Sequence, residues 1–268
     1  MRGNFSHNYA KDCYNYARRF HHVLLNGEAS PLLHLPDRTR GVVMAALSNL
    51  SKFLGIYEEW KAIVKAYGLK WRNGDSCRLL ISRINRVRNG DDILSWIKHV
   101  RASIPKLSLL LNFMLVTGLR LREALASYNL IIKLAGEGRL NEYYNENTCA
   151  LEHFRFEHLF IRRSKKCFVS IIPKEIVMEI AGRGEPLTFH QIDNWVRRDN
   201  GIKSRFSDIR EYWANYMLKW LNPAEIDFLQ GRIGASVFMK NYFNPALIGD
   251  LRDRVLQAQK TLMEQTAP

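Results

Sequence analysis

Two arginines in the chain occupy positions where a helix would present them to a phosphate group. Arg120 lies in TGLRLREAL, just after a glycine break and at the start of an expected helix. Arg210 lies in FSDIREYW, where Ser207 and Asp208 are helix-capping residue types, so Arg210 is expected in a first turn. Free N–H groups, the helix dipole and a bidentate guanidinium all favour phosphate there. Glu123, on the same face as Arg120, is expected to orient it, although a simple surface ion pair would also explain that motif.

A tyrosine near the C-terminus could act as a nucleophile. Tyr242 lies in QGRIGASVFMKNYF (230–243), and on its own it could equally be a packing aromatic. A phenol attacks phosphorus only where cations neutralise the developing charge. Tyr212 and Tyr216 are poorer candidates, because they share a helix with Arg210 and lie mostly on its buried side.

The charge of the chain points to a polyanionic partner. Its 268 residues contain 40 Lys and Arg against 26 Asp and Glu, a formal charge of +14. Basic residues that neutralise phosphates release counterions, so such an excess favours nucleic acid. A membrane surface is the weaker alternative, because no basic amphipathic helix with interfacial aromatics is evident. The basic clusters give these candidate DNA contacts: Arg78, Arg83, Arg86, Arg88, Arg162, Arg163, Lys166, Lys203 and Arg205.

Composition argues against several other classes. No apolar run of about 18 residues and no signal segment is evident, so we expect a soluble cytoplasmic protein that joins the nucleoid when it binds DNA. The four cysteines show no CxxC spacing. The spacing of Cys149, His153 and His158 makes a zinc site conceivable, but only three ligands converge there. The sequence therefore predicts no metal and no cofactor.

The elements that must position these residues form two expected domains. Residues 1–90 give helical patterns that stop at Gly27, Gly55 and Gly68, with a fourth helix from Asp75 or Ser76 to about Arg88. RNGDD (88–92) follows as a linker. The prediction is a helical domain over 1–90 and a second domain over 91–268.

The second domain is expected to be mainly α-helical with a small β-sheet, an α+β class. A buried helix runs to about Val116, breaks at Thr117-Gly118 and restarts. FRFEHLFIRRSKKCFVSIIP (154–173) has aromatic and β-branched residues on both sides of Ser164-Lys165-Lys166, which predicts a β-hairpin. Thr188 and Gln191 have capping-box spacing before another helix.

The C-terminal segment is predicted to be a helix over 246–264 with one apolar face. Ile248, Leu251, Val255, Ala258 and Leu262 follow steps of three and four residues. That face is expected either to fold back on its own domain or to dock on a neighbouring protomer. The second alternative predicts a monomer in free solution and a tetramer on DNA.

Together these motifs resemble the tyrosine recombinase (phage integrase) family. The order TGLRxxEAL, a basic hairpin, an arginine opening a helix and GR…SVF…Y is similar to that family, and LQGRIGASVFMKNYF resembles the integrases of archaeal viruses and plasmids. The resemblance covers the whole chain, with residues 8–88 resembling the core-binding domain and 93–268 the catalytic domain.

The resemblance implies a role for each matching residue. Arg120 and Arg210 would clamp the scissile phosphate, and Tyr242 would attack it to give a 3′-phosphotyrosyl link without metal or ATP. Lys165 matches the family's general acid, with Lys166, Arg162 and Arg163 as rivals because hairpin register is not fixed by sequence.

Two positions depart from the family pattern. Ser207 stands where bacterial members carry a histidine, and serine is no proton acceptor at neutral pH, so the role is absent or is replaced electrostatically by Lys203 or Arg205. Arg232 stands near the position of a His or Trp and can donate to the phosphate. The alternatives to a recombinase for DNA integration or excision are an inactive DNA-binding regulator on the same scaffold and an enzyme like a type IB topoisomerase.

Overall fold

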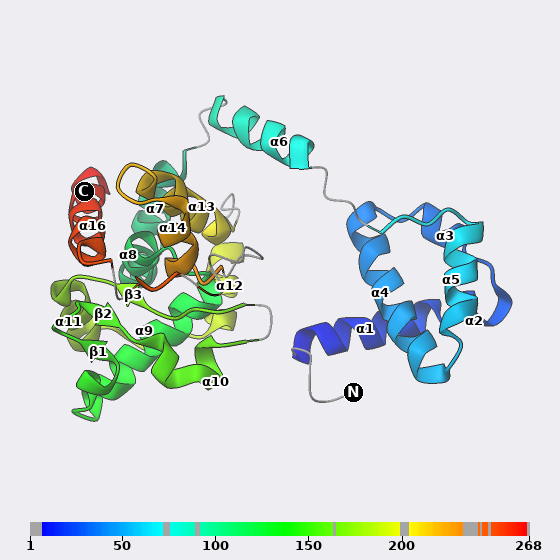
Figure 1. The fold of residues 1–268 in the computed structure, drawn as a ribbon, viewed down its shortest axis with the longest axis horizontal. Helices are drawn as coiled ribbons and strands as arrows, with labels where there is room; N and C mark the ends of the chain where they lie inside the picture. Colours follow the sequence, from blue (N-terminus) through cyan, green and yellow to red (C-terminus); the bar gives the residue numbers. More distant parts are fainter. Residues whose placement is uncertain are drawn as a thin grey trace. The chain divides into compact units, whose positions relative to one another are not determined.

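The computed structural model describes residues 7–71, 76–88, 92–162, 165–198, 204–232, 241, 243–245 and 248–266. The chain divides into two compact units, Met1–Gly90 and Asp91–Pro268. The described residues are mostly α-helical, with one small antiparallel sheet, which confirms the predicted fold class (Figure 1). The DNA-binding and catalytic roles that the sequence assigns to the two units stay predictions.

The first unit is a small helical body. Its core consists of large apolar side chains, among them Val43, Leu47 and Trp60. The Trp60 indole N–H donates to the Ser48 hydroxyl at 2.8 Å. The predicted helix ends near residues 27, 55 and 68 are observed. Its helices are α1 (His7–Phe20), α2 (His22–Asn26), α3 (Ser30–Leu33), α4 (Asp37–Leu54), α5 (Tyr57–Ala66) and α6 (Ser76–Arg88).

The second unit is built around α8, which is buried on every side, as expected of a central helix. Pro105 separates α7 from α8, and α8 ends at the predicted break at Thr117-Gly118. The helices are α7 (Ile93–Ser103), η1 (Pro105–Leu107), α8 (Ser108–Thr117), α9 (Leu121–Gly136), η2 (Leu140–Glu142), η3 (His153–Phe156), α10 (Glu157–Phe160), α11 (Lys174–Arg183), α12 (Phe189–Arg198), α13 (Phe206–Met217), α14 (Pro223–Leu229) and α16 (Leu251–Thr266).

The sheet has the order β1 (Tyr144–Asn145), β2 (Ala150–Leu151), β3 (Ser170–Ile171), and its neighbours are antiparallel. Tyr144 pairs with Leu151, and Leu151 pairs with Ser170. The β1–β2 hairpin was not predicted from the sequence.

The predicted hairpin over 154–173 is wrong in its first arm, because residues 153–160 form η3 and α10. His153, Phe156 and Phe160 follow steps of three and four residues, which brings them to one inward helical face. At the predicted tip, a single bridge joins Ile161 and Lys166. The second arm is a strand, but it pairs with β2.

The C-terminal helix begins at Leu251, later than predicted, and its apolar face is buried within its own unit. Leu251, Val255, Ala258 and Leu262 belong to the same core as α8, and Figure 1 shows α16 beside α8 and β3. Of the two expected alternatives, the structure adopts the fold-back onto the same unit. This face is covered, so a neighbouring protomer would have to use another surface.

Candidate active site

The first arginine is presented by a sharp break between two helices. Gly118 ends α8 with φ 62°, and a Cβ there would lie 2.5 Å from the Trp213 ring, so only glycine fits. Arg120 then caps α9, and its guanidinium donates to both Glu123 oxygens, at 2.8 and 3.0 Å. Glu123 is buried whereas Arg120 is partly exposed, so the carboxylate binds the guanidinium from the side of the protein interior. This contact supports the predicted role of Glu123 in orienting Arg120.

The buried Glu123 carboxylate also holds the turn that carries the candidate lysine. Arg162 donates to Glu123 at 3.2 Å, across 39 residues of sequence. Residues 162 and 165 are joined directly, because the Arg162 N–H donates to the Lys165 carbonyl at 3.0 Å. Lys165 is exposed and Lys166 half-buried. One carboxylate therefore joins the first arginine to the segment 162–166, which we call the lysine turn.

The second arginine connects two other parts of the site. Arg210 lies in α13, is 7% exposed, and donates to the Gly118 carbonyl at 2.9 Å and to the Gln230 carbonyl at 2.5 Å. The Gln230 side chain returns a bond to the Arg210 carbonyl at 3.1 Å. Arg210 thus holds the residue two positions before Arg120 and the residue two positions before Arg232.

The electrostatics of Arg210 reflect these neighbours. The pKa of Arg210 is lowered to about 10, mainly by burial and then by the positive charges of Arg120 and Arg232, while Glu123 acts in the opposite direction. A pKa of about 10 leaves Arg210 charged at neutral pH. Three arginines therefore act on one another here, a concentration of positive charge suited to an anion.

The third arginine follows an unusually close backbone approach. Gly231 has φ 64°, and a Cβ on it would lie 1.8 Å from the Lys166 carbonyl oxygen. Glycine therefore lets the end of α14 touch the lysine turn directly. Arg232 is half exposed and lies 3.6 Å from Asp227. Arg232 and the lysine turn are neighbours through this contact.

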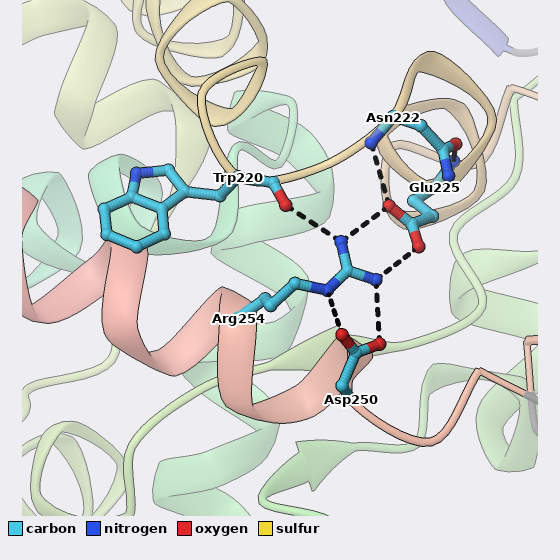
Figure 2. A network of polar contacts seen from close by, with 5 residues as sticks. All are labelled: Trp220, Asn222, Glu225, Asp250 and Arg254. Atoms are coloured by element: carbon cyan, nitrogen blue, oxygen red, sulfur yellow. Dashed lines mark hydrogen bonds and ion pairs between the residues drawn. The ribbon is translucent and has the colours of Figure 1, made fainter.

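A polar network fixes α16 against α14 (Figure 2). Arg254 donates to Glu225 at 2.6 and 3.0 Å, to Asp250 at 2.9 and 3.1 Å, and to the Trp220 carbonyl at 2.8 Å. The hydrogen bond from Arg254 lowers the pKa of Glu225, and the Asn222 N–H also donates to it. The sequence analysis missed this network, since nothing in local spacing connects residues 225 and 254.

A buried glutamine on α16 joins the two segments that carry the arginine break and the lysine turn. The Gln259 amide donates to the Val116 carbonyl at 2.9 Å and to the Ile171 carbonyl at 2.7 Å. The Trp213 indole donates to the same Val116 oxygen at 2.9 Å. Side chains from α13 and α16 therefore both donate to one carbonyl oxygen of α8, two residues before Gly118.

The chain matches a family model in a comparison with known proteins. A model described as archaeal phage integrase matches residues 85–253, more than half of the chain. The chain belongs to the archaeal phage integrase family, a tyrosine recombinase family. Searches of the curated proteins and of the solved structures returned no match. The resemblance drawn from the sequence motifs is thereby confirmed, and with it an integrase or recombinase that acts on DNA.

The match to the integrase family spans all five candidate catalytic positions, of which four are described. The contacts above link Arg120, Arg210, Arg232 and the lysine turn into one region. Tyr242, Arg163 and Lys203 lie outside the described residues, as do the side chains of Arg78, Arg86 and Arg88.

Ser207, at the position of the missing histidine, and Arg205, one of its two expected substitutes, are both engaged near the second arginine. Ser207 is exposed and donates to Asp208 at 3.2 Å, and Arg205 pairs with Asp208 at 2.9 Å. Among the other predicted DNA contacts, the Arg83 side chain is exposed on α6.

His153, one of the three conceivable zinc ligands, has other neighbours in the integrase. His153 is fully buried between the Tyr143 hydroxyl, at 2.6 Å, and the Ser170 hydroxyl, at 2.8 Å, and burial lowers its pKa to about 3. Within the described ranges, no group of three or more His, Cys, Asp or Glu side chains is placed to hold a metal ion. Nor does any helix in those ranges have the length and apolarity to span a membrane.

Proposed function

We propose that this integrase is a site-specific recombinase that cleaves and rejoins DNA through a 3′-phosphotyrosyl intermediate, to integrate or excise a mobile element. The observation that carries the proposal is the position of Arg210. Its buried guanidinium bonds the backbones that lead to Arg120 and Arg232, so folding itself gathers three arginines around one point. Three guanidinium groups gathered in this way are suited to receive an anion.

The arginines would bind the scissile phosphate and stabilise its transition state. A guanidinium has five N–H donors, and Arg210 uses two of its terminal donors on carbonyls, so it retains donors for phosphate oxygens. Arg120 is paired with the buried Glu123 carboxylate and is itself partly exposed. Preorganised donors of this kind stabilise charge as it develops on phosphorus, at no cost of rearrangement.

Lys165 is the best candidate for the general acid that protonates the 5′ leaving oxygen. Lys165 is exposed, whereas Lys166 is half-buried and its carbonyl lies against Gly231. Arg162 is a weaker rival, because its guanidinium pairs with Glu123 and an arginine does not release a proton near neutral pH. A lysine ammonium can release one to the departing oxygen.

Tyr242 would supply the nucleophile. Attack of its phenol oxygen on phosphorus forms the phosphotyrosyl bond as the bond to the 5′ oxygen breaks, so the bond energy is kept for rejoining. No metal, cofactor or ATP is required in this scheme, since arginines and a lysine supply the positive charge. The first unit would bind the DNA next to the cleavage point, and four protomers would hold two sites together.

A plasmid assay separates this function from its two alternatives. The integrase is incubated with supercoiled plasmids that carry either a pair of cognate sites or none, with and without a chelator. We expect recombinant products that depend on the sites and persist in the chelator. Relaxation of both plasmids alike would indicate a topoisomerase, and binding to the sites without strand cleavage would indicate an inactive regulator.

A further inference from the structure

A chain of buried polar side chains connects α9 to β3. The Tyr143 hydroxyl donates to the Ser127 hydroxyl on α9 at 2.8 Å. His153 contacts the same Tyr143 hydroxyl through Nδ1, at 2.6 Å, and the Ser170 hydroxyl through Nε2, at 2.8 Å. All four side chains are buried. None of them belongs to the candidate catalytic set, so their arrangement calls for another role.

The direction of these hydrogen bonds fixes what His153 requires of its neighbours. Tyr143 has a single hydroxyl hydrogen and donates it to Ser127, so the imidazole must donate to Tyr143 from Nδ1. Its Nε2 is then an acceptor, which takes the hydroxyl hydrogen of Ser170. The Phe160 ring lies 4.5 Å from the imidazole, centroid to centroid, and encloses it in an apolar environment. A side chain that can donate is therefore required at position 170.

This requirement selects one register for the strand that follows the candidate lysines. Ser170 is the one polar residue of FVSII (168–172). A shift of the strand by one residue would bring Val169 or Ile171 to Nε2, and neither can donate. Such a shift moves the chain by about 3.4 Å along the strand. Because β3 has only two residues, its main-chain bonds specify the register weakly, and the contact with His153 adds a specific constraint.

Helix α9 holds the same segment at a second point. Arg162 donates to Glu123, and Ser127 lies four residues after Glu123, on the same helical face. Cys167 lies between the two points of attachment. Burial is the main reason that the pKa of its thiol is raised, and the charge of Glu123 is the next. The helix that begins after the first site arginine thus holds the chain on both sides of Lys165.

We propose that His153 is a positioning residue that fixes β3, and with it Lys165 and Lys166, relative to α9. This inference rests on the proposed function. His153 is fully buried, so it acts through Ser170 rather than on the DNA. Its effect on the reaction is to keep the lysine ammonium within reach of the leaving oxygen, because a displacement of about 1 Å already lowers a catalytic rate.

The role is tested by removing one hydroxyl on each side of the imidazole, which leaves the ring itself in place. Tyr143→Phe and Ser170→Ala should both bind a cognate site as the wild type does but cleave it about tenfold more slowly in single turnover. A substrate with a 5′-bridging sulfur should restore both rates, because a thiolate leaves without protonation. A loss that this substrate does not restore would overturn the inference, since the defect would not concern the general acid.

Tyr128→Phe is the matched control for the loss of a buried hydroxyl. Tyr128 lies on α9, is 1% exposed, and its hydroxyl is hydrogen-bonded to the backbone of Glu185 rather than to the segment around β3. This variant should lose stability in thermal unfolding, as Tyr143→Phe does, but cleave at the wild-type rate. Equally slow cleavage by Tyr128→Phe would mean that general destabilisation explains the effect, and would overturn the positioning role.

A double-mutant cycle shows whether the two hydroxyls act through the imidazole between them. Because each single change breaks the same chain, Tyr143→Phe combined with Ser170→Ala should slow cleavage by less than the product of the two single effects. Independent effects, or wild-type rates for both single variants, would contradict the proposal. If the wild type itself does not cleave the site, the proposed function fails first, so the two failures are distinguishable.

Discussion

Replacing Gly231 by alanine should disable the lysine turn. The new Cβ would lie 1.8 Å from the Lys166 carbonyl oxygen, where real contacts are not shorter than 3.0 Å, so the turn must shift by about 1 Å. A misplacement of that size can lower a catalytic rate about 10²-fold. The left-handed φ of 64° adds a backbone cost of about 1–2 kcal/mol.

Gly138→Ala is the matched control for that backbone cost. Gly138 has φ 70° in the same unit, but a Cβ on it meets no atom within 4 Å. Both variants should lose stability in thermal unfolding, and Gly231→Ala alone should lose cleavage activity.

Single-turnover cleavage distinguishes the affected group. If the shifted turn carries the general acid, a 5′-bridging sulfur substrate should restore most of the Gly231→Ala rate, because a thiolate leaves without protonation. Equal cleavage rates for Gly231→Ala and Gly138→Ala would refute the reasoning from the close approach.

The remaining predictions concern stability, proton transfer and DNA affinity. Burial lowers the pKa of His153 from 6.5 to about 3, so the second unit should be fully stabilised above pH 6.5 and lose up to about 1.4 kcal/mol of stability per pH unit below it. His153→Gln should flatten that slope in urea unfolding between pH 7 and 5. Arg254→Met should cost about 2–4 kcal/mol of stability, since it strands the buried Glu225 carboxylate, whereas the exposed Arg252→Met should cost under about 1 kcal/mol. Lys165→Ala should cleave about 10²–10⁴-fold more slowly and be rescued by the 5′-bridging sulfur, and rescue of Lys166→Ala instead would move the role by one residue. Nonspecific DNA affinity should fall with a log–log salt slope of about −5 or steeper, and a flat response would contradict the charge argument.

Local sequence signals predicted the elements that carry the site. The break at Gly118, the helix that follows Arg120 and the capping box of Thr188 and Gln191 each depend on residues close in sequence, and each is observed. The misassigned arm of the hairpin shows the limit of such signals. Phe156 and Phe160 fit a strand by residue type, but their four-residue spacing suits a buried helical face. Packing against the core favours the helical conformation.

The contacts that assemble the site depend on long separations and could not be predicted. Arg210 bonds carbonyls 92 and 20 residues away, and a backbone carbonyl leaves no signature in sequence. The partners of Gln259 are likewise main-chain atoms of distant segments. For the C-terminal helix, the sequence identified an apolar face but not its partner, because an apolar stripe is equally suited to a core and to a neighbouring protomer.

The central claim is that Tyr242 forms a covalent bond to DNA, and the most direct test is capture and mapping of that bond. The wild type and Tyr242→Phe are incubated with a nicked cognate site, denatured, digested and analysed by mass spectrometry. We expect the wild type to carry a nucleotide on the peptide that contains Tyr242, and Tyr242→Phe to bind the site equally well without an adduct. A denaturant-resistant adduct from Tyr242→Phe, or a nucleotide on another residue of the wild type, would contradict the proposed mechanism.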